Sequence, residues 1–131
     1  PLEDQVKGID GVIYNKFAQP NLIAEAMNNS RFFILPTLTD NWPLVINEAC
    51  LSGCGLILSN RVGNRTEFIG KINGIIYNVK RDDLLLDAMI KMALLENNKL
   101  DKISKESRFL GEKYTPKNWS NQFKNIIKSL T

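Results

Sequence analysis

Short apolar runs alternate with longer stretches of mixed polarity through the first 95 residues of the chain. Four of these runs, at residues 12–14, 32–35, 56–58 and 75–77, have the length of β-strands. The run at 32–35 has no polar member and is flanked by Arg31 and Pro36, which is typical of a strand buried on both faces. Apolar residues at helical spacing lie between the runs. The sequence therefore predicts an α/β fold with a Rossmann-like parallel sheet and helices on both faces.

Helix signals fill the segments between these runs. Residues 2–6 are expected to form the last turn of a helix closed by Gly8, and residues 66–69 a single helical turn. Pro20 and Pro43 suit the first turns of two longer helices, and Gly53 is expected to end the second of them. Apolar residues cover nearly the whole circumference of that second helix, so we expect it to be mostly buried.

From residue 82 to its end the chain is predicted to be helical. One helix begins at Asp82, the next spans about residues 100–110, and the last begins with Thr115 as N-cap and Pro116 in its first turn. The residues expected to face inward are, helix by helix, Leu85, Met89 and Met92; Leu100, Ile103 and Leu110; and Trp119, Phe123, Ile126, Ile127 and Leu130. We expect the last of these stripes to pack against this domain or against a partner domain.

The composition is that of a soluble globular protein. With 131 residues, of which 44% are hydrophobic and 24% charged, the chain is long enough for one domain with its own core. The net charge of +3 is too small, and the lysines too dispersed, to predict nucleic-acid binding. No apolar run approaches the ~20 residues of a membrane span. We expect a cytoplasmic protein, with peripheral attachment to the inner face of the membrane as the alternative.

Cys50 and Cys54 are the only cysteines, and the chain has no histidine. The spacing of the two cysteines matches no common metal site, so we expect two small buried residues in a reducing compartment, and no metal. Because the commonest general base is missing, that role would fall to a carboxylate or to residues outside this chain.

Glu48 is the only ionisable residue besides the two cysteines between residues 41 and 60. Its neighbours along the predicted helix are almost all apolar. Burying a carboxylate among such neighbours is costly unless a partner compensates its charge. Glu48 is therefore a candidate site residue, and a satisfied structural acid explains it equally well.

Ligands of parallel sheets bind outside the carboxyl ends of the strands, so the loops at 15–18, 37–42, 60–66 and 78–81 are the places to expect a site. The start of the helix at Pro43 offers free N–H groups to a phosphate. The amides of Gly63 and Asn64 are expected to add to this anion site, flanked by Arg61 and Arg65.

Asp40 and Glu48 place two carboxylates around that anion site. The first stands just before the helix and the second lies within the second turn of the helix. Carboxylates accept hydrogen bonds from sugar and ribose hydroxyls, often two at once. We interpret the pair as the means of holding a sugar nucleotide whose phosphates meet the helix amides.

Residues 33–69 resemble the nucleotide-sugar-binding C-terminal domain of retaining GT-B glycosyltransferases of the glycosyl transferase group 1, or family 4, type. That family has a strand ending in Pro-Ser or Pro-Thr, an E-x7-E motif, a small-residue turn with glycine, an apolar strand and a loop of the SDRVG type. The matching residues are, in order, Pro36 and Thr37, Asp40, Glu48, Ser52 and Gly53, residues 56–58, residues 59–63 and Glu67. The similarity extends to nearly the whole chain.

The resemblance implies a domain that binds a nucleotide-diphospho-sugar as substrate, with no metal and no other cofactor. Asp40 would contact hydroxyls of the donor sugar together with the backbone of Trp42 and Leu44. The amides of Leu44 and Val45 would meet the diphosphate, and Glu48 would hold the ribose hydroxyls.

The resemblance also places the backbone of Phe17 and Ala18 against the nucleotide base. Gly63, Asn64 and Glu67 would support the loop, and no residue of this chain is assigned a catalytic role. The parent protein would be a retaining hexosyltransferase, of the EC 2.4 type, that acts in glycan or polysaccharide biosynthesis.

The sequence also departs from the family's pattern. Asp40 replaces a glutamate and shortens the reach of the carboxylate by one methylene, and Trp42 with Pro43 replaces the usual Phe-Gly. The family's basic pair for the diphosphate and its whole acceptor domain lie outside this chain. We therefore expect residues 1–131 to be one donor-binding domain, truncated on its N-terminal side and inactive alone.

The family's sheet order, 3-2-1-4-5-6, would separate residues 12–15 from residues 32–35. We expect either direct pairing of these two strands or another chain in the gap, with self-association through open sheet edges. Two other functions stay open. One is a non-catalytic nucleotide-sugar-binding or interaction module derived from the same fold. The other is a flavodoxin-like or receiver-like domain, although the acidic cluster of a receiver is missing.

Overall fold

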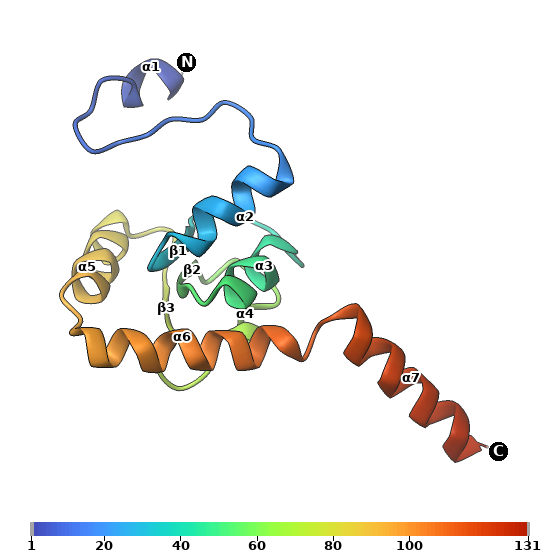
Figure 1. Cartoon of the computed structure of the whole chain (residues 1–131). Coiled ribbons are helices and arrows are strands. Elements are labelled where there is room, and N and C mark those ends of the chain that lie inside the picture. Colours follow the sequence, from blue (N-terminus) through green and yellow to red (C-terminus); the bar gives the residue numbers. More distant parts are fainter. Residues whose placement is uncertain (1, 131) are drawn as a thin grey trace.

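A three-stranded parallel sheet lies at the centre of the structure, a computed structural model that describes residues 2–130 (Figure 1). Its strands are β1 (Phe32–Leu35), β2 (Gly55–Ser59) and β3 (Gly74–Tyr77), in the order β1-β2-β3. Phe33 lies opposite Leu56, and Leu56 lies opposite Gly74. The prediction of a parallel α/β fold is confirmed.

The helices around the sheet follow the predicted pattern, with one exception. They are α1 (Leu2–Val6), α2 (Pro20–Asn28), α3 (Val45–Ser52), α4 (Arg65–Phe68), α5 (Asp82–Ala93), α6 (Asn97–Glu112) and α7 (Pro116–Leu130). The exception is α3, which begins at Val45 with Leu44 as N-cap, so Pro43 precedes the helix instead of opening it. The predicted ends are confirmed at two places. Gly53 ends α3 in the left-handed conformation, with φ of 85°. Thr115 caps α7, because its hydroxyl accepts a hydrogen bond of 3.3 Å from the amide of Asn118.

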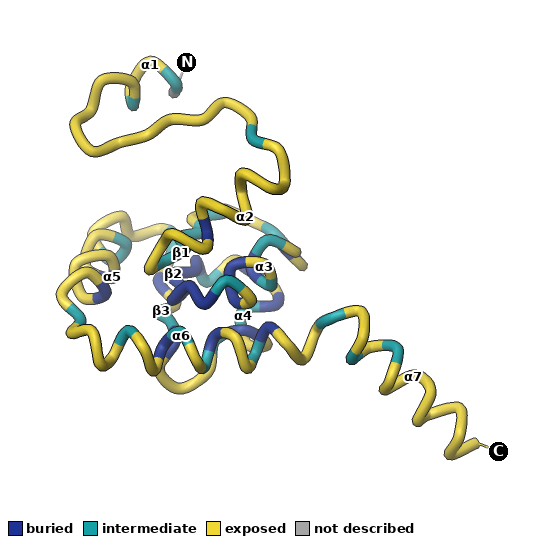
Figure 2. The backbone as a smooth tube through the Cα atoms, viewed as in Figure 1, coloured by how far each residue is buried: buried dark blue, intermediate teal, exposed yellow. Residues whose placement is uncertain are grey.

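Alternate residues of β2 belong to different cores, as the pleat of a strand requires. Leu56 and Leu58 join α2, α3 and α4 in one apolar cluster, which also holds the predicted buried cysteines. Ile57 joins α5 and α6 in a second cluster on the other face of the sheet. The buried backbone is therefore concentrated around β2 and α3 (Figure 2). This arrangement confirms that helices cover both faces.

Residues 12–14 do not form the predicted strand. Val12, Ile13 and Tyr14 are irregular in conformation and exposed, Ile13 at 87%. A strand is stable only with a neighbour that completes its backbone hydrogen bonds, and the described residues offer none here. Of the two predicted arrangements, direct pairing of this segment with residues 32–35 is therefore wrong. Figure 1 shows the segment looping away from the sheet, and the alternative of another chain in the gap stays a prediction.

Two predictions of burial are also wrong in degree. The four residues of β1 are half-buried rather than buried on both faces, because β1 is an edge strand of this sheet. In α3, only one side is buried, by Ile46, Ala49 and Cys50, whereas Leu51 and Glu48 are exposed. The premise that Glu48 stands in an apolar interior does not hold.

The C-terminal helices separate into a packed pair and an outlying helix. Met92 of α5 and Ile103 of α6 are buried as predicted, whereas Met89 is exposed and the other predicted inward residues of these two helices are half-buried. No residue of α7 is buried, and α7 extends away from the sheet (Figure 1). The predicted packing of its stripe against this domain is wrong. No helix among residues 2–130 is long and apolar enough to cross a membrane.

Candidate functional site

The loops that follow β1 and β2 are joined at the carboxyl edge of the sheet. The amide of Asp40 donates to the carbonyl oxygen of Arg61 at 3.3 Å, and the amide of Gly63 donates to the carbonyl oxygen of Asp40 at 2.8 Å. Asp40 and Val62 thus form an isolated parallel bridge. This ladder-like contact brings together the two loops in which the sequence placed its site residues.

The contact between the two loops requires a glycine at residue 63. A Cβ atom at residue 63 would overlap the carbonyl group of Asn41, which is backbone and cannot rotate away. The amide of Gly63 is also occupied by Asp40, so it is not available to a phosphate as the sequence predicted. Gly63 therefore fixes the distance between the two loops.

Asp40 is half-buried, and its side chain closes a short turn within its own loop. Its Oδ1 atom accepts a hydrogen bond of 3.2 Å from the amide of Trp42. The amide of Trp42, predicted to contact the donor sugar, is thus already used inside the chain. Among the described residues, the Oδ2 atom of Asp40 has no hydrogen-bond partner and stays available to a ligand.

The first turn of α3 leaves backbone amides unpaired. Ile46 donates to the carbonyl oxygen of Pro43 at 3.4 Å, and Asn47 to that of Leu44 at 3.0 Å. The amides of Leu44 and Val45, in contrast, have no partner among residues 2–130. They are the free donors that a helix N-terminus is expected to present to an anion.

Glu48 lies one turn further along α3, on the exposed side that faces α2. It lines a hollow of about 400 Å³ together with Pro20, Ile23 and Met27 of α2. The carboxylate is therefore accessible to a ligand from solvent.

Phe17 and Ala18 lie across α2 from Glu48. Both line an apolar hollow of about 520 Å³, and Phe17 is 80% exposed. Ile23 and Met27 belong to this hollow as well as to that of Glu48, so the two hollows adjoin. Residues that the sequence placed at the base and at the ribose are therefore neighbours across one helix.

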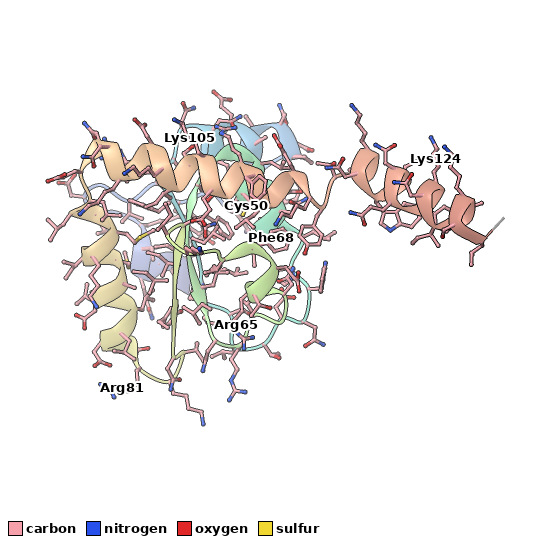
Figure 3. The ribbon with its side chains drawn as sticks, turned by 90° about the horizontal axis from the view of Figure 1, so that it is seen from below. Cys50, Arg65, Phe68, Arg81, Lys105 and Lys124 are labelled. Atoms are coloured by element: carbon pink, nitrogen blue, oxygen red, sulfur yellow. The ribbon has the colours of Figure 1, made fainter. Side chains whose placement is uncertain are left out.

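Asn64 connects the loop after β2 to the start of α3, and Glu67 connects α4 to the turn between α6 and α7. Asn64 is 1% exposed and its Nδ2 atom donates to the carbonyl oxygen of Pro43 at 3.4 Å. Glu67 accepts a short hydrogen bond from the hydroxyl of Tyr114, which raises the pKa of Tyr114 above its usual value. Tyr114 also packs on Phe68, a core residue labelled in Figure 3, with ring centroids 4.9 Å apart.

A third hollow, of about 460 Å³, was not indicated by the sequence. It lies between the start of α3 and the start of α7, and Trp42, Asn47, Asn64, Tyr114 and Trp119 are among its lining residues. These residues come from three separate segments of the chain, at residues 42–47, 64–68 and 113–122. Only the tertiary structure brings them together.

The fold and the position of these residues define a Rossmann-like α/β domain with its candidate site at the carboxyl ends of parallel strands. The chain belongs to the family of glycosyl transferases group 1, whose family model matches residues 2–110. This confirms the resemblance to the GT-B glycosyltransferases. No curated protein matches the sequence.

A sucrose-phosphate synthase from Thermosynechococcus elongatus has a similar structure, with a TM-score of 0.81 and 16% sequence identity. The match covers 98% of this chain and 33% of the synthase chain. At this identity the likeness supports the fold alone. The chain thus spans about a third of the length of the structure that it matches.

Proposed function

We propose that this chain is the donor-binding domain of a retaining hexosyltransferase and that it holds a nucleotide-diphospho-sugar. The observation that carries this proposal is that unpaired amides and an exposed carboxylate lie one turn apart on α3, beside α2. Unpaired amides of Leu44 and Val45 come first, the exposed carboxylate of Glu48 follows one turn later, and the hollow of Phe17 adjoins it.

Each group has a role that suits its chemistry. The two amides donate to the diphosphate, and the partial positive charge of the helix start adds to their attraction. Glu48 accepts hydrogen bonds from the two ribose hydroxyls, and the apolar wall beside Phe17 and Ala18 receives the base. The free Oδ2 atom of Asp40 accepts a hydroxyl of the sugar, while Gly63, Asn64 and Glu67 keep the loop and helix in place.

The wider proposal concerns the parent protein. We infer that a second, acceptor-binding domain completes the cleft, that transfer proceeds without a metal, and that the product is a glycan or polysaccharide made in the cytoplasm. The family's name supports glycosyl transfer as the reaction class. We expect this chain alone to bind the donor without transferring it.

Calorimetric titration of the chain with UDP-, GDP- and ADP-glucose tests the binding role. We expect one of the three to bind and the Glu48→Ala variant to lose at least about tenfold in affinity, because it loses hydrogen bonds to a charged group. Glu25→Ala is a matched control, since Glu25 is an exposed acid of α2 outside both hollows and should bind as the parent chain does. Absence of binding to all three ligands would contradict the proposal.

The alternative candidate is a non-catalytic module, and the turn at Asp40 favours it. The side chain that should contact the donor sugar is shorter by one methylene than the family's glutamate. One of its carboxylate oxygens already accepts a hydrogen bond from the amide of Trp42. An Asp40→Asn variant separates the two. A donor site predicts weaker binding of the nucleotide sugar and unchanged binding of the matching nucleoside diphosphate. A module that ignores the sugar predicts equal affinities for both ligands in both proteins.

A further inference from the structure

Both tryptophans of the chain line one hollow, which contains neither Glu48 nor Phe17. This is the hollow of about 460 Å³ between the start of α3 and the start of α7, and Trp42 and Trp119 are the only tryptophans in the sequence. Their side chains are 55% and 66% exposed. Small-molecule sites have volumes of about 300–1,000 Å³ and are lined by aromatic and apolar groups with a few polar ones, so the hollow suits a ligand.

Contacts within the chain hold the aromatic side chains of this hollow in place. The indole of Trp119 stacks on Phe123, with ring centroids 5.4 Å and ring planes 5° apart. The ring of Tyr114 packs on Phe68, and its hydroxyl donates a short hydrogen bond to Glu67. Rings that are ordered before a ligand arrives lose less conformational entropy on binding. The hollow therefore offers a preformed aromatic wall.

Two amide side chains of the same hollow have unpaired oxygens. The Nδ2 atom of Asn47 donates to the carbonyl oxygen of Tyr114 at 3.4 Å, and that of Asn64 donates to the carbonyl oxygen of Pro43 at 3.4 Å. These bonds fix which end of each amide is the oxygen. Both Oδ1 atoms are buried and have no hydrogen-bond partner among residues 2–130. An unpaired buried acceptor is unfavourable, so the hollow needs hydrogen-bond donors that a ligand would supply.

A sugar ring has the chemistry that this combination requires. Its hydroxyl groups donate to amide oxygens, and its C–H face packs on an aromatic ring. The two unpaired oxygens belong to different segments, α3 and the loop after β2, so they need donors that point in more than one direction. The hydroxyls of a hexose do so, whereas a nucleobase carries its few N–H donors in one plane.

The charge of the hollow favours a neutral sugar. Within residues 2–130, Lys113 is the only charged residue that lines it. The ammonium group of Lys113 lies over the ring of Phe109, 4.7 Å from the ring centroid. This cation already has a partner, so no charge in the hollow selects an acidic or a phosphorylated sugar.

The hollow lies on a different side of α3 from the proposed ribose contact. Glu48 lines the hollow beside α2, whereas Asn47 bonds to Tyr114 in the turn between α6 and α7. Successive side chains of an α-helix are about 100° apart, so residues 47 and 48 point to separate places. Leu44 lines the hollow, and its unpaired amide belongs to the proposed diphosphate site. The two sites therefore meet at the first turn of α3 without sharing Glu48.

We propose that this hollow, with Trp42, Asn47, Asn64, Tyr114 and Trp119 in its wall, binds a neutral hexose unit of a glycan acceptor. The binding of a sugar follows from the aromatic wall and the unpaired oxygens. The assignment to the acceptor rests on the proposed function, because a second sugar beside a nucleotide-sugar site is the substrate that receives the transferred hexose. The acceptor glycan then contacts this chain as well as the second domain.

Titration with simple glycosides tests the carbohydrate site. The probes are the methyl glycosides of glucose, galactose, mannose and N-acetylglucosamine. Because both tryptophans line the hollow, tryptophan fluorescence of the chain reports on it directly. We expect at least one glycoside to bind with a dissociation constant of about 1–10 mM. Saturation-transfer NMR of the same mixture should show transfer to the C–H protons of the sugar ring.

Variants test the aromatic wall and the amides separately. Trp119→Ala should weaken glycoside binding at least about tenfold, because the stacking surface is lost. Asn47→Leu removes an unpaired acceptor and should weaken binding about fivefold. Ile126→Ala is the control, since Ile126 is an exposed apolar residue of α7 outside the hollow, and it should bind as the parent chain does. Trp119 is exposed, so its variant should keep the circular dichroism of the parent chain.

A competition experiment separates an acceptor sugar from the sugar of the donor. The glycoside affinity should change by less than about twofold at a saturating concentration of whichever of UDP-, GDP- and ADP-glucose binds. Displacement of the glycoside by the nucleotide sugar would overturn the proposal, because it assigns the hollow to the donor.

Two further results would overturn the carbohydrate site itself. One is the absence of saturable binding of all four glycosides up to about 100 mM. The other is glycoside binding that neither Trp119→Ala nor Asn47→Leu weakens. If a glycoside binds and none of the three nucleotide sugars does, the proposed function fails and the acceptor role fails with it, whereas the carbohydrate site is supported.

Discussion

Single residues decide how the two site loops meet, and Gly63 is the clearest case. Gly63→Ala places a methyl group against the carbonyl of Asn41, so the loops must separate. We expect the free energy of unfolding to fall by about 1–3 kcal/mol. Donor binding should weaken as well, because Asp40 moves with its loop. Thr66→Ala, at an exposed position three residues after Gly63, is the control. It should change neither the free energy of unfolding, measured with urea, nor donor binding, measured by calorimetry.

Cys50 gives a prediction about pH. Burial, with a smaller contribution from Cys54, raises the pKa of the Cys50 thiol from 9.0 to about 12. Above about pH 9 the unfolded thiol loses its proton while the folded one keeps it, so the folded state holds more protons. The free energy of unfolding should therefore fall as the pH rises from 9 towards 12, at about 1 kcal/mol per pH unit.

Urea unfolding at about pH 8 and about pH 10 measures this effect. Cys50→Ala should show a smaller decrease between the two conditions than the parent chain, whatever its absolute stability. Equal decreases in both proteins would show that the Cys50 thiol does not carry the pH dependence.

At the scale of elements, buried polar residues connect helix α6 to the sheet. The hydroxyl of Ser107 donates to the carbonyl oxygen of Cys54 at 2.7 Å and accepts from the Nδ2 atom of Asn73 at 3.1 Å. Asn73 also donates to the carbonyl oxygen of Phe68 at 2.9 Å. The network therefore fixes α6 against β2 and the turn before β3.

Removing the hydroxyl from this network should be costly. Ser107→Ala leaves buried polar atoms without partners, and we expect a loss of about 1–3 kcal/mol in the free energy of unfolding. Ser104→Ala, one turn earlier on α6 and outside the network, should have little effect. Urea unfolding of both variants measures the difference. Equal losses of stability in the two variants would show that the hydrogen bonds of Ser107 do not stabilise the packing of α6.

The elements also show where sequence patterns fail. Residues 12–14 have the apolar run of a strand, but a run specifies only the propensity of a segment and not the neighbour that a strand needs. The stripe of α7 predicted packing against this domain or a partner domain, and this domain leaves it exposed, because periodicity indicates which side is apolar without indicating what covers it. Glu48 was placed in an apolar helix, yet only the packing of α2 and α6 against α3 determines which side of that helix is open.

At the scale of the whole molecule, the sheet domain and α7 are separable. No residue of α7 is buried, so a chain that ends at Thr115 should retain the parent chain's free energy of unfolding within about 1 kcal/mol. The same chain should keep nucleotide-sugar binding, because no residue of α7 belongs to the proposed donor site. A cooperative loss of structure on this truncation, seen by circular dichroism, would show that α7 contributes to the core.

The sequence by itself determined the parallel α/β fold, the bounds of most helices and the family. These features depend on local signals such as periodicity, Pro at helix starts, Gly53 at a helix end and the ordered motif from Pro36 to Glu67. Only the tertiary structure decided which polar groups and which apolar surfaces are free to bind a ligand or a partner. It occupied the amides of Trp42 and Gly63, opened Glu48 to solvent beside α2, formed the hollow at Asn47 and Tyr114, and left α7 uncovered. Availability depends on contacts between residues far apart in the chain, and no local pattern specifies them.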